Sequence, residues 1–115
     1  MVVKGRIAAF AAFIVILRPF TLLPPMVGIA SGSFAAVGSI ANQGQVSFAE
    51  IFTASYGDII LGAIMAAVLN GASNVLNQIT EVELDRVNKP MRALPSRTMS
   101  MAIAQWYCAA LYGIA

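Results

Sequence analysis

Three oxygen-bearing side chains lie four residues apart in the chain: Asn77, Glu81 and Asp85. On a continuous helix this spacing places them in one slanted stripe that rises roughly 6 Å per step. Carboxylate and amide oxygens are the ligands that hard divalent cations prefer, and such cations bind diphosphates. The spacing therefore predicts a site for a cation or a phosphate group.

A competing interpretation is that these acids merely end a helix and are neutralised by the bases of residues 86–92. Acids near a helix C-terminus oppose the helix dipole, at a cost of about 0.3–1 kcal/mol each at exposed sites. Because this placement is unfavourable, we favour a binding role. Lys89 and Arg92, beside Pro90 and Pro95, are placed to reach phosphate oxygens, although the positive-inside pattern also accounts for them.

The composition indicates an integral membrane protein. The 115 residues are 59% hydrophobic and 10% charged, whereas a soluble domain has about a quarter charged residues. Residues 19–49, 59–80 and 98–115 contain no charge. Each stretch is near or above the roughly 18–20 residues that cross a bilayer as a helix.

The distribution of charge predicts the topology. All seven bases precede the first span or follow the second, and the connection between the spans holds only Glu50 and Asp58. The positive-inside rule then places the N-terminus and residues 85–100 in the cytoplasm, with the protein in the plasma membrane. A net charge of +2 without a basic, aromatic-rich run argues against nucleic acid as a partner. One cysteine and no histidine argue against zinc.

The elements expected to position the stripe are all helical. We predict an interfacial helix over residues 1–18, where a signal-peptide core is the alternative. The other elements are a first span over 21–41, an external loop over 42–57 with a short surface helix near 48–52, a second span over 58–84, a cytoplasmic loop over 85–100 and the start of a third span over 101–115. Gly28 and Gly32 would let another helix approach the first span. The polar inner half of the second span, which includes Asn74, should face a cavity or another helix.

Residues 77–96, with the sequence NQITEVELDRVNKPMRALPS, resemble the first signature of the UbiA superfamily of intramembrane prenyltransferases. That signature is an Asn-x-x-x-Asp-x-x-x-Asp helix end followed by a basic loop. Arg18-Pro19 is similar to a recurring Arg-Pro of the same family. The resemblance covers essentially the whole chain and implies a multi-helix bundle in the membrane.

The resemblance also implies an activity and its site. Asn77, Glu81 and Asp85 would bind Mg²⁺ and, through it, a polyprenyl diphosphate, with Glu81 and Asp85 in the catalytic role. The residues implied to bind substrate are Asn77, Asn74, Lys89, Arg92 and Arg18. The prenyl group would pass to an aromatic or other lipid-precursor acceptor within the membrane lipid.

The chain departs from the family pattern in three ways. Glu81 stands where the family usually has Asp, Gln78 replaces a frequent Asp, and Ala93 and Arg97 replace the usual Pro and Gly of the loop. No acid follows Asp85, although the family has a second acid motif in a later helix. We therefore expect half of a metal site and no activity from these 115 residues alone. The alternative function is a non-catalytic membrane segment that binds lipid diphosphate or a partner helix.

Overall fold

A computed structural model describes residues 2–44 and 46–115, with side chains from residue 5 onward. These residues are all-α and contain no strand, which confirms the predicted fold class. The elements are α1 (Val2–Ile16), the 3-10 turn η1 (Pro19–Thr21), α2 (Leu23–Ala41), α3 (Phe48–Thr80), α4 (Val82–Asn88) and α5 (Met101–Ile114).

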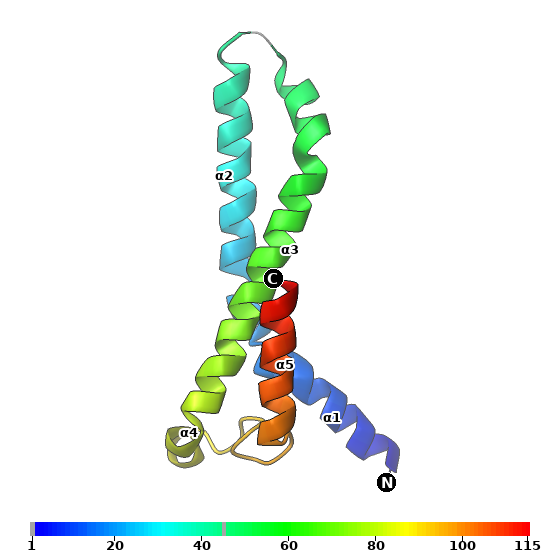
Figure 1. Ribbon diagram of the computed structural model, residues 1–115, viewed down its shortest axis with the longest axis vertical. Coiled ribbons are helices and arrows are strands. Elements are labelled where there is room, and N and C mark those ends of the chain that lie inside the picture. The colour runs from blue at the N-terminus through cyan, green and yellow to red at the C-terminus, as the bar shows by residue number, and fades with distance from the viewer. Residues whose placement is uncertain (1, 45) are drawn as a thin grey trace.

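The long helix α3 is the axis of the fold (Figure 1). Its 33 residues span about 50 Å. The helix α2 packs antiparallel to its N-terminal half, and α5 packs antiparallel to its C-terminal half (Figure 1). The helix α4 and the loop before α5 lie at the C-terminal end of α3, and α1 runs outward from the C-terminal half of α3 (Figure 1). By length and composition, α2 and α3 are able to cross a membrane.

The second long helix begins earlier than the sequence interpretation placed it. We expected a loop as far as residue 57, but α3 begins at Phe48 because Ser47 and Glu50 form a capping box. The Ser47 hydroxyl accepts a hydrogen bond from the Glu50 amide at 3.3 Å, and the Glu50 carboxylate accepts one from the Ser47 amide at 2.9 Å. These bonds pair amide groups that a helix start otherwise leaves without partners.

The same helix ends earlier than expected, with a change of direction at Glu81. The backbone there has φ −98° and ψ 10°, so α3 stops at Thr80 and α4 leaves its line (Figure 1). The hydrogen bonds nevertheless continue across the bend, from the Glu81 amide to Asn77 O at 2.9 Å and from the Asp85 amide to Glu81 O at 2.8 Å. The stripe predicted from one straight helix is therefore bent at its middle member.

Close helix approach occurs at a different glycine from the predicted pair. A Cβ atom at Gly28 or Gly32 would meet nothing within 4 Å in the described structure. At Gly71 it would lie 2.9 Å from Leu17 Cδ2. A methyl group at Gly71 would displace the end of the Leu17 side chain, so the small residue eases the approach of the segment after α1 to α3.

The buried core lies where α1, α3, α5 and the loop before α5 meet. Its buried members are Ala12, Ile16, Val75, Ala93, Leu94, Met99, Ala104 and Cys108. The edge of the Phe13 ring packs against the Tyr107 ring, with centroids 5.1 Å apart. The loop expected to be only a cytoplasmic connection thus contributes three of these side chains.

Because Ala104 is fully buried in this core, Ala104→Leu is expected to be destabilising by overpacking. The expected loss is about 1–3 kcal/mol of unfolding free energy. Thermal unfolding of the protein in lipid nanodiscs measures it. The matched control is Ala102→Leu, because Ala102 is exposed on the same helix and should change stability little. Equal melting temperatures for the two variants would contradict the packing of α5 on α3.

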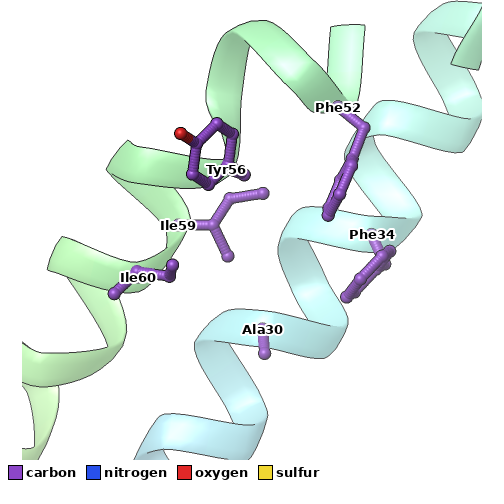
Figure 2. A pocket seen from close by; sticks show the side chains of 6 residues that line it. All are labelled: Ala30, Phe34, Phe52, Tyr56, Ile59 and Ile60. Carbon is purple, nitrogen blue, oxygen red and sulfur yellow. The ribbon is translucent and has the colours of Figure 1, made fainter. Parts of the chain in front are cut away.

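At the other end of α3, its first turns pack on α2 through aromatic rings. The Phe34 ring stacks on the Phe52 ring at 5.3 Å between centroids, and the Phe48 ring lies beside both. An adjacent pocket of about 300 Å³ lies between Ala30 and Phe34 of α2 and the Phe52, Tyr56 and Ile59 side chains of α3 (Figure 2). Its lining is apolar apart from the Tyr56 hydroxyl, so it suits hydrocarbon rather than diphosphate.

Candidate functional site

The strongest electrostatic contact at the C-terminal end of α3 joins Asp85 and Arg92. Asp85 lies on α4 and is 2% exposed. The Arg92 guanidinium, from the following loop, donates to Asp85 Oδ2 at 2.5 Å. A charged group so far from water is costly unless it is paired. The ion pair therefore holds the loop against α4 and places a base beside the predicted catalytic acid.

The other two members of the stripe lie in a different environment. Asn77, on the last turns of α3, and Glu81, at the bend, are both exposed. Glu83 is exposed as well, and its carboxylate forms a surface ion pair with Arg86, with 2.8 Å between Glu83 Oε1 and Arg86 Nη1. The structure thus brings Asp85 and Arg92 into contact and leaves Glu81 and Asn77 accessible, about one and two turns before Asp85 respectively.

The remaining predicted bases, Lys89 and Arg18, are exposed and lie on different parts of the fold. Lys89 follows α4, and Arg18 lies between α1 and η1. Neither forms an ion pair with an acid within the described residues. Residues 86–97 belong to α4 and to the loop before α5, at the end of α3 away from its connection to α2 (Figure 1). The membrane topology stays a prediction.

A row of three side-chain amides on α3 binds the end of α1. Asn70, Asn74 and Gln78 lie four residues apart, and we call them the amide row. Gln78 Nε2 donates to Ile16 O at 2.7 Å, and Asn74 Nδ2 donates to Leu17 O at 2.8 Å. The last carbonyls of a helix have no partner within the helix, so these amides satisfy them.

The amide row also binds the 3-10 turn. Asn70 Nδ2 donates to Thr21 O at 2.7 Å, and Asn74 Nδ2 donates to Thr21 Oγ1 at 2.8 Å. The Thr21 hydroxyl in turn donates to Arg18 O at 2.8 Å. Asn74, predicted to bind substrate, therefore uses its amide nitrogen to hold the backbone. The prediction that the polar face of α3 meets another part of the protein is confirmed for these residues.

Sequence reasoning placed Asn70 and Gln78 on the polar face of the second helix but did not identify what they bind. The signal was available, because residues 70, 74 and 78 repeat an amide every fourth position in the C-terminal half of α3. What could not be inferred was the partner, which consists of backbone carbonyls 49 to 62 residues earlier in the chain.

The donor set suits a hard cation in part. Asn77, Glu81 and Asp85 offer only amide and carboxylate oxygens, which Mg²⁺ prefers. Asp85 Oδ2 already accepts from Arg92, which leaves Oδ1 of the same carboxylate. Among the residues that the structure describes, no three His, Cys, Asp or Glu side chains gather as a metal cluster. The residues present fit one side of a magnesium site.

Curated proteins similar to this chain are named as synthases of digeranylgeranylglyceryl phosphate and as a geranyltransferase. Digeranylgeranylglyceryl phosphate synthase of Methanoculleus marisnigri is 32% identical over 102 residues, which is 89% of this chain and 31% of that protein. The protein of the same name from Thermococcus kodakarensis is 35% identical over 104 residues, or 90% of this chain and 32% of that protein. Coumarin 8-geranyltransferase 1, chloroplastic, of Citrus limon is 31% identical over 90 residues, which is 78% of this chain and 20% of that protein.

The chain spans about a third of the length of the first two relatives. No solved structure gives a significant match. The model of the UbiA prenyltransferase family matches residues 34–115, which is well over half of the chain and includes the bent stripe and the basic loop. The chain belongs to the UbiA prenyltransferase family.

Proposed function

We propose that the protein transfers a polyprenyl group from a polyprenyl diphosphate to an aromatic or other lipid-precursor acceptor within the membrane, in a magnesium-dependent reaction. The family match over residues 34–115 carries this proposal. It is supported by the buried Asp85–Arg92 pair, which places an acid and a base together at the polar end of an apolar helix. Ionisable groups at such a position in a membrane protein indicate a functional site.

In the proposed reaction, the bond between the allylic carbon and the diphosphate oxygen breaks. The electron pair leaves with diphosphate, and an allylic cation remains. A ring carbon or hydroxyl oxygen of the acceptor then forms the new bond and loses its proton. Arg92 and Lys89 would contact diphosphate oxygens and stabilise the negative charge that develops on them. The surrounding apolar helices would keep water from the cation.

The cation-binding role is proposed for Asn77, Glu81 and Asp85. When bound, Mg²⁺ would supply positive charge against the diphosphate oxygens and so favour its departure. The three protein oxygens would orient the diphosphate at the end of α3, below the apolar part of the bundle. Their bent arrangement supplies ligands from one side, so further ligands would come from diphosphate, from water or from other protein groups.

Membranes that contain the protein as its gene encodes it should convert a labelled prenyl diphosphate and an acceptor into a prenylated product. A panel of geranylgeranyl diphosphate with a phenolic acceptor or a glycerophosphate lipid tests both acceptor classes. Chelation of divalent cations with EDTA should abolish the product, and added Mg²⁺ should restore it. Absence of product with every pair, or transfer that persists in EDTA, would contradict the proposal.

We also propose that the N-terminus and the basic loop face the cytoplasm of a cell whose plasma membrane holds the protein. Ser96 and Gln43 are exposed at opposite ends of α3, whereas Cys108 is buried. A membrane-impermeant thiol reagent applied to intact cells should label Gln43→Cys and spare Ser96→Cys. Lysis of the cells should make Ser96→Cys reactive. The opposite labelling pattern would reverse the proposed orientation.

A further inference from the structure

A small cavity lies between α4 and the start of α5, beyond the C-terminal end of α3 (Figure 1). We call it the α4–α5 cavity. Two arginines line it, Arg86 of α4 and Arg97 of the following loop, together with Ser100 and apolar side chains that include Leu94 and Met99. No acid is among its lining residues in the described part of the chain. Its volume of about 250 Å³ suits a small anionic group rather than a large ligand.

Both arginines of the cavity have N–H groups that are available to a ligand. Arg97 forms no ion pair within the described residues. Arg86 pairs with Glu83 through Nη1, and both side chains of that pair are exposed. Exposed ion pairs contribute little, so an anion can compete with Glu83 for Arg86. A guanidinium also has further donors, which match the oxygens of a phosphate group.

The first turn of α5 adds donors to the same cavity. Ser100 caps this helix, and its hydroxyl oxygen accepts a hydrogen bond from the Ile103 amide at 3.3 Å. The hydroxyl proton is thereby left for another acceptor. The first amides of a helix have no partner within the helix, and the helix dipole favours an anion beside them. The cavity thus combines two positive charges with a hydroxyl and a helix start.

The loop that carries Arg97 is anchored in the core. Leu94 and Met99, on either side of Arg97, are each 5% exposed. The Arg97 amide donates to Leu94 O at 3.0 Å, and the Met99 amide donates to Ala93 O at 3.1 Å. The fold therefore fixes the backbone of Arg97 beside the cavity, and a ligand needs to order little more than its side chain.

The cavity also lies where the charged part of the chain ends. Residues 98–115 hold no charge, and α5 lies within them. If α5 begins a span, as we expect, Arg97 and Ser100 lie at the level of the lipid headgroups. Basic pockets between membrane helices at this level bind anionic headgroups. The apolar walls, which include Met101, suit the first carbons of a lipid.

We propose that the α4–α5 cavity binds a phosphate group through Arg86, Arg97 and Ser100, and that this phosphate is the headgroup of an anionic membrane lipid. The residues proposed to bind Mg²⁺ and diphosphate do not line the cavity. The inference therefore goes beyond the proposed function and does not rest on it. A bound lipid joins α4 to the start of α5 through contacts with both.

The test measures how tightly the protein, as its gene encodes it, binds phosphatidylglycerol in detergent solution. Native mass spectrometry of wild type and variant in one sample gives the affinity for the first lipid. Arg97→Gln should weaken binding about tenfold, the size of one charge-assisted contact. The matched control is Arg6→Gln, which removes the same charge from an exposed base on α1 and should stay within about twofold of wild type.

Two further variants test the residues of the cavity. Arg97 has φ 58°, a region that favours glycine. Arg97→Gly should therefore bind as weakly as Arg97→Gln but melt no earlier than wild type, which separates lost binding from lost stability. Glu83→Gln releases Arg86 from its ion pair and should strengthen binding about twofold to fivefold. Unchanged or weaker binding in Glu83→Gln would overturn the role of Arg86.

Two other ligands distinguish the sources of the phosphate group. Glycerol phosphate has the same headgroup chemistry without hydrocarbon chains, and it should displace phosphatidylglycerol poorly even in large excess. Phosphatidylcholine, whose choline offsets the phosphate charge, should bind at least about tenfold more weakly. Displacement by glycerol phosphate at equal concentration would assign the cavity to a soluble ester and overturn the lipid as its ligand. Wild-type affinity in Arg97→Gln, or equal losses in Arg97→Gln and Arg6→Gln, would overturn the site itself.

Discussion

Asp85→Asn is expected to lower prenyl transfer by at least about a hundredfold, as the loss of one electrostatic group in a preorganised site commonly does. Asparagine has almost the same shape, and its Oδ1 can still accept a hydrogen bond from Arg92. The fold should therefore survive while the negative charge proposed to bind Mg²⁺ is lost. Initial rates over a series of Mg²⁺ concentrations measure the effect, and the concentration needed for half-maximal rate should rise.

Glu83→Gln is the matched control for this substitution. Glu83 lies two residues earlier on α4 and also pairs with an arginine, but that pair is exposed to solvent. Exposed ion pairs contribute about 0–1 kcal/mol, and Glu83 has no proposed contact with substrate. Its rate should remain within about twofold of wild type, which corresponds to well under 1 kcal/mol. Equal losses in the two variants, or an unaltered rate and Mg²⁺ dependence in Asp85→Asn, would refute the metal role.

Arg92→Ala is expected to have the largest effect on stability. The Asp85 side chain is 3% exposed and the Arg92 side chain 20% exposed, so removal of the base leaves a buried carboxylate without its partner. Loss of one partner of a buried ion pair typically costs about 3–5 kcal/mol. We expect a lower melting temperature in nanodiscs and faster proteolysis of the loop before α5. Transfer should fall as well, because a proposed diphosphate contact is gone.

Two further variants separate the charge effect from simple truncation. Arg86→Ala truncates an arginine of the exposed pair with Glu83, and it should change stability by no more than about 1 kcal/mol. The double variant Asp85→Asn/Arg92→Ala removes both charges of the buried pair. It should recover part of the stability but none of the transfer activity. A double variant as unstable as Arg92→Ala would show that packing, rather than the unpaired charge, causes the loss.

The fold class was predictable because it depends on composition and on the position of charges. Long uncharged stretches predict spans, and the structure places α2 and most of α3 within them. The start of α3 was also predictable in principle, since Ser47 and Glu50 have the spacing of a capping box. The apolar run alone led us to begin the second span at residue 58, because hydropathy does not show where a helix begins when its first turns are not apolar throughout.

The bend at Glu81 and the partners of the polar side chains were not predictable in the same way. No proline or glycine marks residues 77–85, so the local sequence favoured a straight stripe. The burial of Asp85 arises from Arg92 and from the loop that folds back onto the core, and both are tertiary effects. For the site, the sequence indicated which groups are present at one end of α3. The contacts between these groups depend on how the loop before α5 folds back onto α3 and α4, which the local sequence does not show.

The attachment of α1 to α3 has a consequence for biosynthesis. The carbonyl of Ile16 binds an amide 62 residues later, in Gln78. At translation rates of about 5–20 residues per second, that partner is made several seconds after α1. During this interval the end of α1 must keep its carbonyls hydrated at the membrane surface, because the hydrocarbon interior offers them no donor. We therefore expect α1 to reach its final position only after the amide row of α3 has been made.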